Sequence, residues 1–301
     1  MKGKQIPAYN DAKPMCRPLC HQVVHFIRFQ VFFFSVFMLT GCNSIFYHPT
    51  QTQYYQIEDF KTKPELISFN NSVGTHLSGW YFKTNQVRKK GVIIQFHGNA
   101  QNISSHFSFL HWIIPHGYDL FIFDYSGYGL SKGRSTVENL RQDAIAAFQY
   151  VEKKIKKNQI PIILFAQSLG VAVLTDAFSY FQNKNFIKAI ILDSGFYSYQ
   201  EIARDKLNQF WLFWPFQHFA YLLITDSHSP EKHFQKFSPI PTLVIHGKKD
   251  RVVPFNHGEK IYELLKQKKT FWKIENGSHT SAMPGHAGLY REKLLKYLDD
   301  I

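Results

Sequence analysis

Cysteine and long apolar runs are both scarce in this chain of 301 residues. The three cysteines are Cys16, Cys20 and Cys42. The apolar run FQVFFFSVFML at 29–39 is too short to cross a bilayer as a helix. The chain also lacks a phosphate-binding loop and a dinucleotide-binding glycine motif, so nothing in it indicates a nucleotide cofactor.

The short apolar run instead has the length and position of a signal-peptide core. The four residues that close it, 39–42, read L-T-G-C and resemble the bacterial lipobox, where cleavage leaves a lipid-modified cysteine as the first residue. We therefore predict a signal peptide at 1–41 and lipidation of Cys42. A short buried segment that ends in the same letters is the alternative. Whether Met1 or Met15 is the true start stays open.

Loss of residues 1–41 changes both the cysteine count and the charge. Cys42 becomes the only cysteine, which excludes a disulfide framework and a cysteine-built metal site. The net charge falls from +13 to +9, because five basic residues and one acidic residue leave. The remaining lysine clusters at 153–157 and 266–269 are explained as solvated helix ends, and attraction to anionic lipid is the alternative. No nucleic-acid-binding motif accompanies them, so nucleic acid is not an expected partner.

Beyond residue 60 the chain alternates apolar runs with amphipathic ones. Residues 42–60 show no period and are expected to form a polar tether, and strand-like runs at 65–70 and 75–82 follow it. Strands that alternate with amphipathic helices predict a mostly parallel sheet with helices on both faces, and an active site beyond the carboxyl ends of the strands. Further strands are expected at 91–96, 119–124, 160–166, 188–193, 241–247 and 270–275, with helices at 105–114, 135–155, 169–181, 256–267 and 286–298.

Three residues with catalytic side chains stand directly after expected strands. They are Ser168, Asp250 and His279, each on a loop at the same edge of the sheet. Their order along the chain is the order of the triad in α/β hydrolases. Three matches of residue type, order and position together carry more weight than any one motif.

The motifs FHGNAQN, DYSGYGLSKG, AQSLG, HGKKDRVVPFNHGEK and NGSH together resemble those of the α/β-hydrolase superfamily. The similarity extends over about 60–298 and points to membrane-associated serine hydrolases, acyl-protein depalmitoylases and serine aminopeptidases. It implies an α/β-hydrolase domain at 61–301, with a short aromatic-rich cap insertion at about 200–235. It says little about the substrate.

Ser168 stands in A-Q-S-L-G, whereas the nucleophile elbow G-x-S-x-G has glycine at the position of Ala166. The elbow holds its serine in a strained conformation at a tight turn, so the residues two before and two after it must be small. Gly170 meets this need, and the methyl of Ala166 is tolerable if this residue has an ordinary strand conformation. We therefore predict that Ser168 is the nucleophile; an ordinary serine at a strand-to-helix turn is the alternative.

The remaining roles follow from the need of a serine hydroxyl for an adjacent base. His279 is the predicted base, and Asp250 is predicted to orient its ring and stabilise its charged form. His97 is the competing base and Asp193 the alternative acid, while Asp124 is expected to brace its loop through hydrogen bonds. Surface or helix-capping roles are expected for the other nearby histidines, which are His246, His257 and His286.

The oxyanion formed by attack on a carbonyl needs donors that already point at it. We predict the backbone N–H groups of Asn99 and Leu169 for this role, and their side chains need not take part. No metal or organic cofactor is required.

The segment FWLFWPFQHFAYLLI at 210–224 has seven aromatics in fifteen residues. An apolar helix packed on the sheet, an acyl-pocket wall or membrane-facing lid, and a partner surface all stay open for it.

The leading hypothesis is a lipid-anchored serine hydrolase of the bacterial cell envelope that cleaves carboxylic esters or thioesters of acyl chains. Asn43, rather than aspartate, after the cysteine permits sorting to the outer membrane. A serine peptidase or amidase is the second hypothesis, because the same triad serves both reactions. A non-catalytic binding protein is the third, and the intact set of serine, aspartate and histidine argues against it. The sequence does not determine the oligomeric state.

Overall fold

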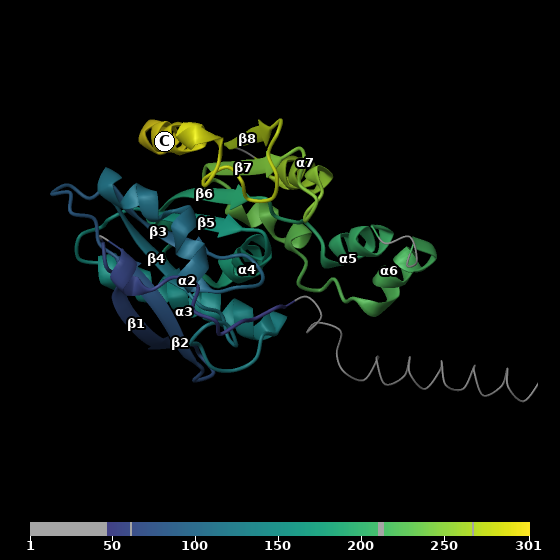
Figure 1. Cartoon of the computed structure of the whole chain (residues 1–301), viewed down its shortest axis with the longest axis horizontal. Helices are drawn as coiled ribbons and strands as arrows, with labels where there is room; N and C mark the ends of the chain where they lie inside the picture. The colour runs from purple at the N-terminus through teal and green to yellow at the C-terminus, as the bar shows by residue number, and fades with distance from the viewer. Residues whose placement is uncertain (1–46, 61, 210–213, 267) are drawn as a thin grey trace, which may run out of the picture. The chain divides into compact units, whose positions relative to one another are not determined.

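The computed structural model describes residues 47–60, 62–209, 214–266 and 268–301. These residues form an eight-stranded sheet in the order β1-β2-β4-β3-β5-β6-β7-β8 (Figure 1). The pairs β1–β2 and β2–β4 are antiparallel and the other pairs are parallel, which confirms the predicted mostly parallel sheet. The strands are β1 (Glu65–Asn70), β2 (His76–Phe82), β3 (Gly91–Phe96), β4 (Tyr118–Phe123), β5 (Ile162–Gln167), β6 (Ile187–Asp193), β7 (Thr242–Gly247) and β8 (Lys269–Ile274).

Helices cover both faces of this sheet. They are α2 (Ile103–His106), α3 (Val137–Ile155), α4 (Leu169–Ala177), α5 (Tyr199–Asn208), α6 (Ala220–Leu223), α7 (Phe255–Leu264) and α8 (Leu289–Asp300). Val92, Ile94 and Phe96 of β3 belong to one core with α3, α4 and α7, whereas Ile93 belongs to a second core with α2 and α8. Because both faces of the strand are covered, all six of its residues are buried and its sequence is apolar almost throughout.

The prediction of one helix at 105–114 is wrong. The chain there forms the short α2 and then two 3₁₀ segments, η3 (Phe107–Phe109) and η4 (His111–His116). Phe107, Leu110 and Ile113 are all buried in the second core. Their spacing of three residues matches the 3₁₀ period, so burial of these side chains favours the tighter helix.

Residues 47–60, expected as part of a free tether, pack against the domain instead. Tyr47 is 5% exposed, and the carbonyl of Thr50 accepts a hydrogen bond from Gly129 N–H at 3.0 Å. The segment is held mainly through its backbone groups, which leaves no apolar period for a sequence to display. The predicted signal peptide at 1–41 and Cys42 lie outside the described residues. In the described ranges no helix is long and apolar enough to cross a membrane.

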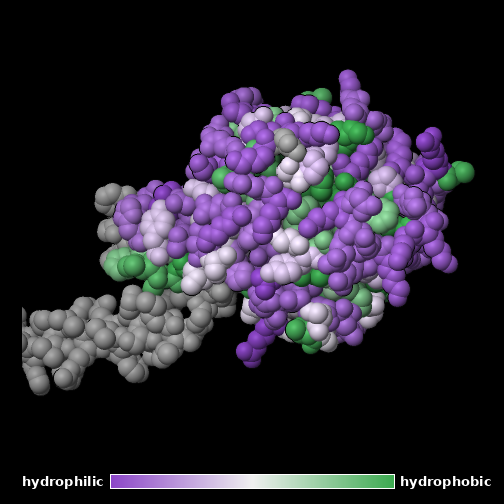
Figure 2. Space-filling view, turned by 180° about the vertical axis from the view of Figure 1, so that it is seen from behind, coloured by the Kyte–Doolittle hydropathy of each residue, from purple (hydrophilic) through white to green (hydrophobic). Residues whose placement is uncertain are grey.

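The insertion between β6 and β7 forms a helical lobe that contains α5, η7 (Trp214–Phe219) and α6. Figure 1 shows this lobe on the side of the domain toward which β5, β6 and β7 run. Phe219, Tyr221 and Leu222 of the aromatic segment are exposed, and Figure 2 shows hydrophobic surface on the lobe. This part of the insertion is therefore not a helix whose apolar face packs on the sheet.

Candidate active site

Ser168 lies at the turn from β5 into α4, with φ +51° and ψ −116°. This backbone conformation is strained for a residue that has a Cβ, and it persists only where the surroundings impose it. The Ser168 N–H donates to the carbonyl of Asp193, at the end of the neighbouring β6, at 2.9 Å. Within the described part of the chain the Ser168 hydroxyl makes no hydrogen bond, so it is available to a base.

The small residues on either side of Ser168 have different roles. A Cβ on Gly170 would lie 2.2 Å from the carbonyl oxygen of Phe96, so only glycine lets α4 approach β3 this closely. Ala166 is fully buried in β5 and pairs in regular parallel register with Phe96 and Leu192. Ala166 thus has the ordinary strand conformation in which we expected its methyl group to be tolerated.

Asp250 and His279 meet through a short hydrogen bond. His279 Nδ1 lies 2.7 Å from Asp250 Oδ2, while Asp250 Oδ1 accepts the backbone N–H groups of Val252 and Val253 at 2.8 Å each. With Nδ1 donating to the carboxylate, the ring keeps Nε2 as the acceptor, which is the tautomer that a general base needs.

The surroundings of Asp250 keep its carboxyl ionised. Burial raises its pKa, but hydrogen bonds from His246, His279 and Val253 N–H outweigh burial and leave the pKa well below its ordinary value. The negative charge is therefore present at neutral pH, where it can stabilise a protonated His279.

Two glycines bring the loops of Asp250 and His279 together. A Cβ on Gly247, at the end of β7, would lie 2.2 Å from the carbonyl oxygen of Gly277. The same carbonyl accepts the N–H of Lys249 at 2.9 Å. The loop after β7 and the loop after β8 are thus in backbone contact, because neither glycine has a side chain to separate them.

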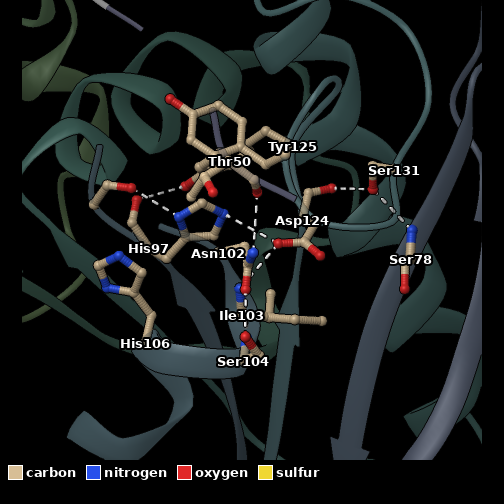
Figure 3. Close-up of polar contacts among 12 residues, drawn as sticks. Thr50, Ser78, His97, Asn102, Ile103, Ser104, His106, Asp124, Tyr125 and Ser131 are labelled. Atoms are coloured by element: carbon tan, nitrogen blue, oxygen red, sulfur yellow. Dashed lines mark hydrogen bonds and ion pairs between the residues drawn. The ribbon is translucent and has the colours of Figure 1, made fainter. Parts of the chain in front are cut away.

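His97, the competing base, lies enclosed beneath the loop that follows β3. It is fully buried, with Nδ1 2.7 Å from the Gly98 carbonyl oxygen and Nε2 3.9 Å from Asp124 Oδ1 (Figure 3). Burial and repulsion from His106 hold its pKa well below the ordinary value. The same Asp124 oxygen accepts the Ile103 N–H at 2.9 Å, which confirms that Asp124 braces its loop. His97 therefore supports the loop and is out of reach of a substrate.

Asp193, the alternative acid, acts on the site through another residue. Its Oδ1 accepts the Ser194 hydroxyl at 3.0 Å, and Ser194 Oγ in turn accepts the N–H of Thr280 at 3.0 Å. Asp193 thus supports the loop that carries His279. Among the described residues, no hydrogen bond joins the Asp193 carboxyl to the His279 ring. Burial raises the pKa of Asp193 to about 6, in the direction opposite to Asp250.

His246 was missed as a site residue, and the surface or capping role expected for it is wrong. It is fully buried, with Nε2 2.9 Å from the Val253 carbonyl oxygen and 3.5 Å from Asp250 Oδ2. A Cβ on Gly258 would lie 2.6 Å from its Nδ1, so a close approach by α7 encloses the ring. His257 is fully buried as well and lies 3.2 Å from Asp205 of α5. The place of His246 in the otherwise apolar run TLVIHG was a signal of burial.

The two predicted oxyanion donors lie beside the nucleophile. Leu169 opens α4, where backbone N–H groups have no partner within the helix. The loop of Asn99 passes close by, because a Cβ on Gly98 would lie only 3.5 Å from Ser168 Cβ. The Asn99 side chain is itself held in place, since its Oδ1 accepts two hydrogen bonds from other elements.

A cavity of the described chain lies apart from the candidate catalytic residues. In the described ranges no group of three or more His, Cys, Asp or Glu side chains could hold a metal ion. A cavity of about 330 Å³ lies between 51–57 and the first hairpin, and neither Ser168, Asp250 nor His279 lines it. The candidate catalytic residues therefore face the carboxyl edge of the sheet rather than this cavity.

A strained serine at the β5–α4 turn and an aspartate–histidine pair at the same sheet edge define an α/β hydrolase. The family described as serine aminopeptidase, S33 matches residues 87–230. The chain is also 34% identical over 238 residues to the uncharacterised protein YfhR of Escherichia coli K12, which covers 78% of this chain and 80% of that protein. The chain belongs to the α/β-hydrolase superfamily, and it is a hydrolase.

Two further comparisons find one relative and one solved structure whose names include an activity. It is 28% identical over 226 residues to the lysophosphatidylserine lipase ABHD12 of Danio rerio, over 72% of this chain and 57% of that protein. The solved structure of the Pyrococcus furiosus esterase Pf2001 superposes with a TM-score of 0.67 at 15% identity, over 85% of this chain and 98% of that chain. Likeness at this low identity concerns the fold.

Proposed function

We propose that this hydrolase is a serine esterase that cleaves carboxylic esters or thioesters of acyl chains, with Ser168 as nucleophile, His279 as base and Asp250 as the carboxylate that orients His279. The observation that carries the proposal is the hydrogen bond of 2.7 Å between His279 Nδ1 and Asp250 Oδ2, at the sheet edge that also presents the strained Ser168. Each of the three residues comes from a different loop, and the close contact of Gly247 with Gly277 brings the loops of Asp250 and His279 together.

The reaction proceeds in two halves through an acyl-enzyme. His279 takes the proton of the Ser168 hydroxyl while Oγ attacks the carbonyl carbon, and the N–H groups of Leu169 and Asn99 bind the negative oxygen that forms. The carbon–oxygen or carbon–sulfur bond to the leaving group then breaks, and His279 returns the proton to the departing alcohol or thiol. Water repeats the sequence on the acyl-Ser168 ester, releasing the acid and restoring the serine.

Exposed apolar residues of the insertion support an acyl substrate. Leu222 is 77% exposed, and Phe219 and Tyr221 are exposed beside it on the lobe next to the sheet edge. Such a surface near a hydrolase site suits substrates that carry a hydrocarbon chain. The lipase activity named for the relative from Danio rerio is consistent with the same class of substrate.

Aminopeptidase activity is the second candidate, and the description of the matched family favours it. An aminopeptidase binds the free amine of its substrate and needs an unpaired carboxylate for this purpose. The carboxylates of α5 are already paired, since Glu201 and Asp205 lie 2.7 and 3.0 Å from Arg204. Lys206 follows them on the same helix, makes no ion pair within the described residues, and has its pKa lowered by burial. On α5, therefore, no unpaired carboxylate is available to bind the amine of a substrate.

We further propose that a lipid on Cys42 anchors the enzyme to a bacterial membrane, with the outer membrane as a permitted destination. Four residues, 43–46, separate Cys42 from Tyr47, which is packed on the domain. The five Cα-to-Cα steps between Cys42 and Tyr47 reach about 18 Å when fully extended. The domain would therefore stay next to the lipid surface, where the net positive charge of the mature chain favours anionic headgroups.

A substrate panel tests the proposed activity. The protein is assayed with p-nitrophenyl esters of increasing chain length, an acyl thioester and aminoacyl-anilides, each with the Ser168→Ala variant as control. We expect turnover of esters and thioesters that rises with acyl length, little turnover of anilides, and none in the variant. Preferential cleavage of the anilides would establish the aminopeptidase instead, and equal turnover by the variant would refute the role of Ser168.

A further inference from the structure

Residues 47–55, here called the strap, lie across the loops that follow β3 and β4. The His48 N–H donates to Asn99 Oδ1 at 2.9 Å, and Gly129 N–H donates to the Thr50 carbonyl at 3.0 Å. The Tyr54 N–H donates to Ser104 Oγ at 3.0 Å. The strap thus contacts both loops mainly through its backbone, so its course depends little on its own side chains.

Asn99 is the point where the strap and both loops meet. Its Oδ1 accepts the His48 N–H and also the hydroxyl of Tyr128, the latter at 2.7 Å. The side chain is therefore held from two directions by elements far apart in sequence. The backbone N–H of the same residue is the predicted second donor to the oxyanion, so what holds the side chain also fixes the direction of that N–H.

The residues after Asn99 need this external support. Ala100 and Gln101 have φ angles of +59° and +56°, a left-handed conformation that strains residues other than glycine. Asn102 ends the strained stretch, and its Nδ2 donates to the carbonyls of Thr50 and Thr52 at 3.0 and 2.8 Å. The strained turn is thus held at both ends by the strap.

Asp124 and His97 close the loop from beneath. Figure 3 shows Asn102 between Thr50 and the start of α2, with Asp124 facing the Ile103 backbone and the His97 ring. Asn102 Oδ1 accepts the Ser104 N–H at 3.0 Å and so caps that helix. The loop therefore lies between a buried carboxylate on one side and the strap on the other.

We propose that the strap and the Asn99 side chain are positioning elements of the oxyanion site: they hold the Asn99 peptide so that its N–H points at the carbonyl oxygen under attack. This proposal rests on the proposed function, because it presumes that an oxyanion forms there. Tyr47, the first strap residue, is buried and hydrogen-bonds Tyr199 of α5. The strap thereby joins the oxyanion loop to the insertion that lies at the same sheet edge.

The proposal makes a distinctive kinetic prediction. A donor that is aimed at the oxyanion stabilises the transition state far more than the bound substrate. Loosening it should lower kcat and leave KM almost unchanged, whereas general damage to the fold would lower the amount of active protein and the melting temperature.

The test is a double-mutant cycle on the full-length protein with Tyr128→Phe, Asn99→Ala and the double variant. Tyr262→Phe is the matched control, because Tyr262 packs on Phe271 of β8, away from the strap. We expect each single variant to lose about tenfold or more in kcat with KM within about twofold. In the Asn99→Ala background the Tyr128→Phe change should cost much less, because the hydrogen bond between the two side chains is already absent.

The outcomes separate this proposal from the proposed function. If the wild-type protein hydrolyses esters while both single variants match Tyr262→Phe in kcat, the positioning role is refuted and the esterase stands. Fully additive losses would also refute it, because the two side chains would then act independently. If the wild-type protein hydrolyses no ester and resists fluorophosphonate labelling, the esterase itself is refuted.

Discussion

Asp250 and Asp193 stand after neighbouring strands of the sheet, and their surroundings move the two carboxyl pKa values in opposite directions. Asp250→Asn should lower kcat by roughly 10⁴-fold, because an amide no longer holds His279 in the tautomer that accepts a proton. Asp193→Asn should cost less, since Asp193 reaches the site only through Ser194. Both are measured as kcat on one p-nitrophenyl ester. A greater loss in Asp193→Asn would transfer the acid role to that residue.

Ala166 allows a second test at the scale of one side chain. Ala166→Gly should leave kcat/KM within a few-fold, because the strand conformation at this position does not need glycine. Ala166→Val should reduce activity strongly, since a β-branched side chain would press on fully packed neighbours beside the elbow. Activity and melting temperature are measured for both variants. Full activity of the valine variant would show that the elbow is less crowded than the structure indicates.

The three residues of the candidate triad could be picked out from the sequence because each lies on a loop that follows an apolar strand. The burial of His246 could be inferred from its apolar run, but its position beside Asp250 could not, because the course of the loop after β7 decides it. The Asn99 side chain was missed for a similar reason. Its partners, the His48 N–H and the Tyr128 hydroxyl, come from distant parts of the chain that no local pattern links.

At the scale of elements, Asp124 joins the loops after β3 and β4 and should make the free energy of unfolding depend on pH. Burial raises the pKa of Asp124 to about 7, against an unfolded value of about 3.9. The folded state therefore retains a proton that the unfolded state releases. The resulting stabilisation is fully present below about pH 4 and is lost as the pH rises through about 7.

Asp124→Asn removes this titration, and its amide oxygen can still accept the Ile103 N–H. The free energy of unfolding is measured in urea at several pH values between 4 and 8 for both proteins. As the pH rises, wild type should lose stability relative to the variant, because only wild type must ionise a buried carboxyl. Subtracting the unfolding free energy of the variant from that of wild type at each pH removes the contribution of the other titrating groups, which both proteins share. A difference that is independent of pH would show that Asp124 is ionised throughout this range.

The strands were the most predictable elements. A parallel strand covered on both faces must be apolar along its length, and β3 and β5 show this pattern directly. The 3₁₀ segments η3 and η4 were not predictable, because the packing of the second core selects their period. The strap was mistaken for a tether since extended backbone that bonds to loops carries no apolar period.

For the whole molecule, the proposed anchor makes a prediction about location. Wild type and Cys42→Ala, each with a C-terminal tag, are expressed in a bacterium fed labelled palmitate and then fractionated. Wild type should carry the label and sediment with membranes, because a multiply acylated cysteine anchors stably. The variant should lack the label and keep its leader uncleaved. Equal labelling of both proteins would remove the lipoprotein proposal and leave residues 1–41 as an ordinary signal or anchor.

The nucleophilic role of Ser168 is the claim on which the rest of the account depends. The most direct measurement is mass spectrometry of the protein after reaction with a fluorophosphonate, which forms a covalent adduct with an activated serine. We predict one adduct per chain, located by peptide mapping on Ser168 and absent from Ser168→Ala with a preserved circular dichroism spectrum. An adduct on another serine, or undiminished labelling of the variant, would contradict the account.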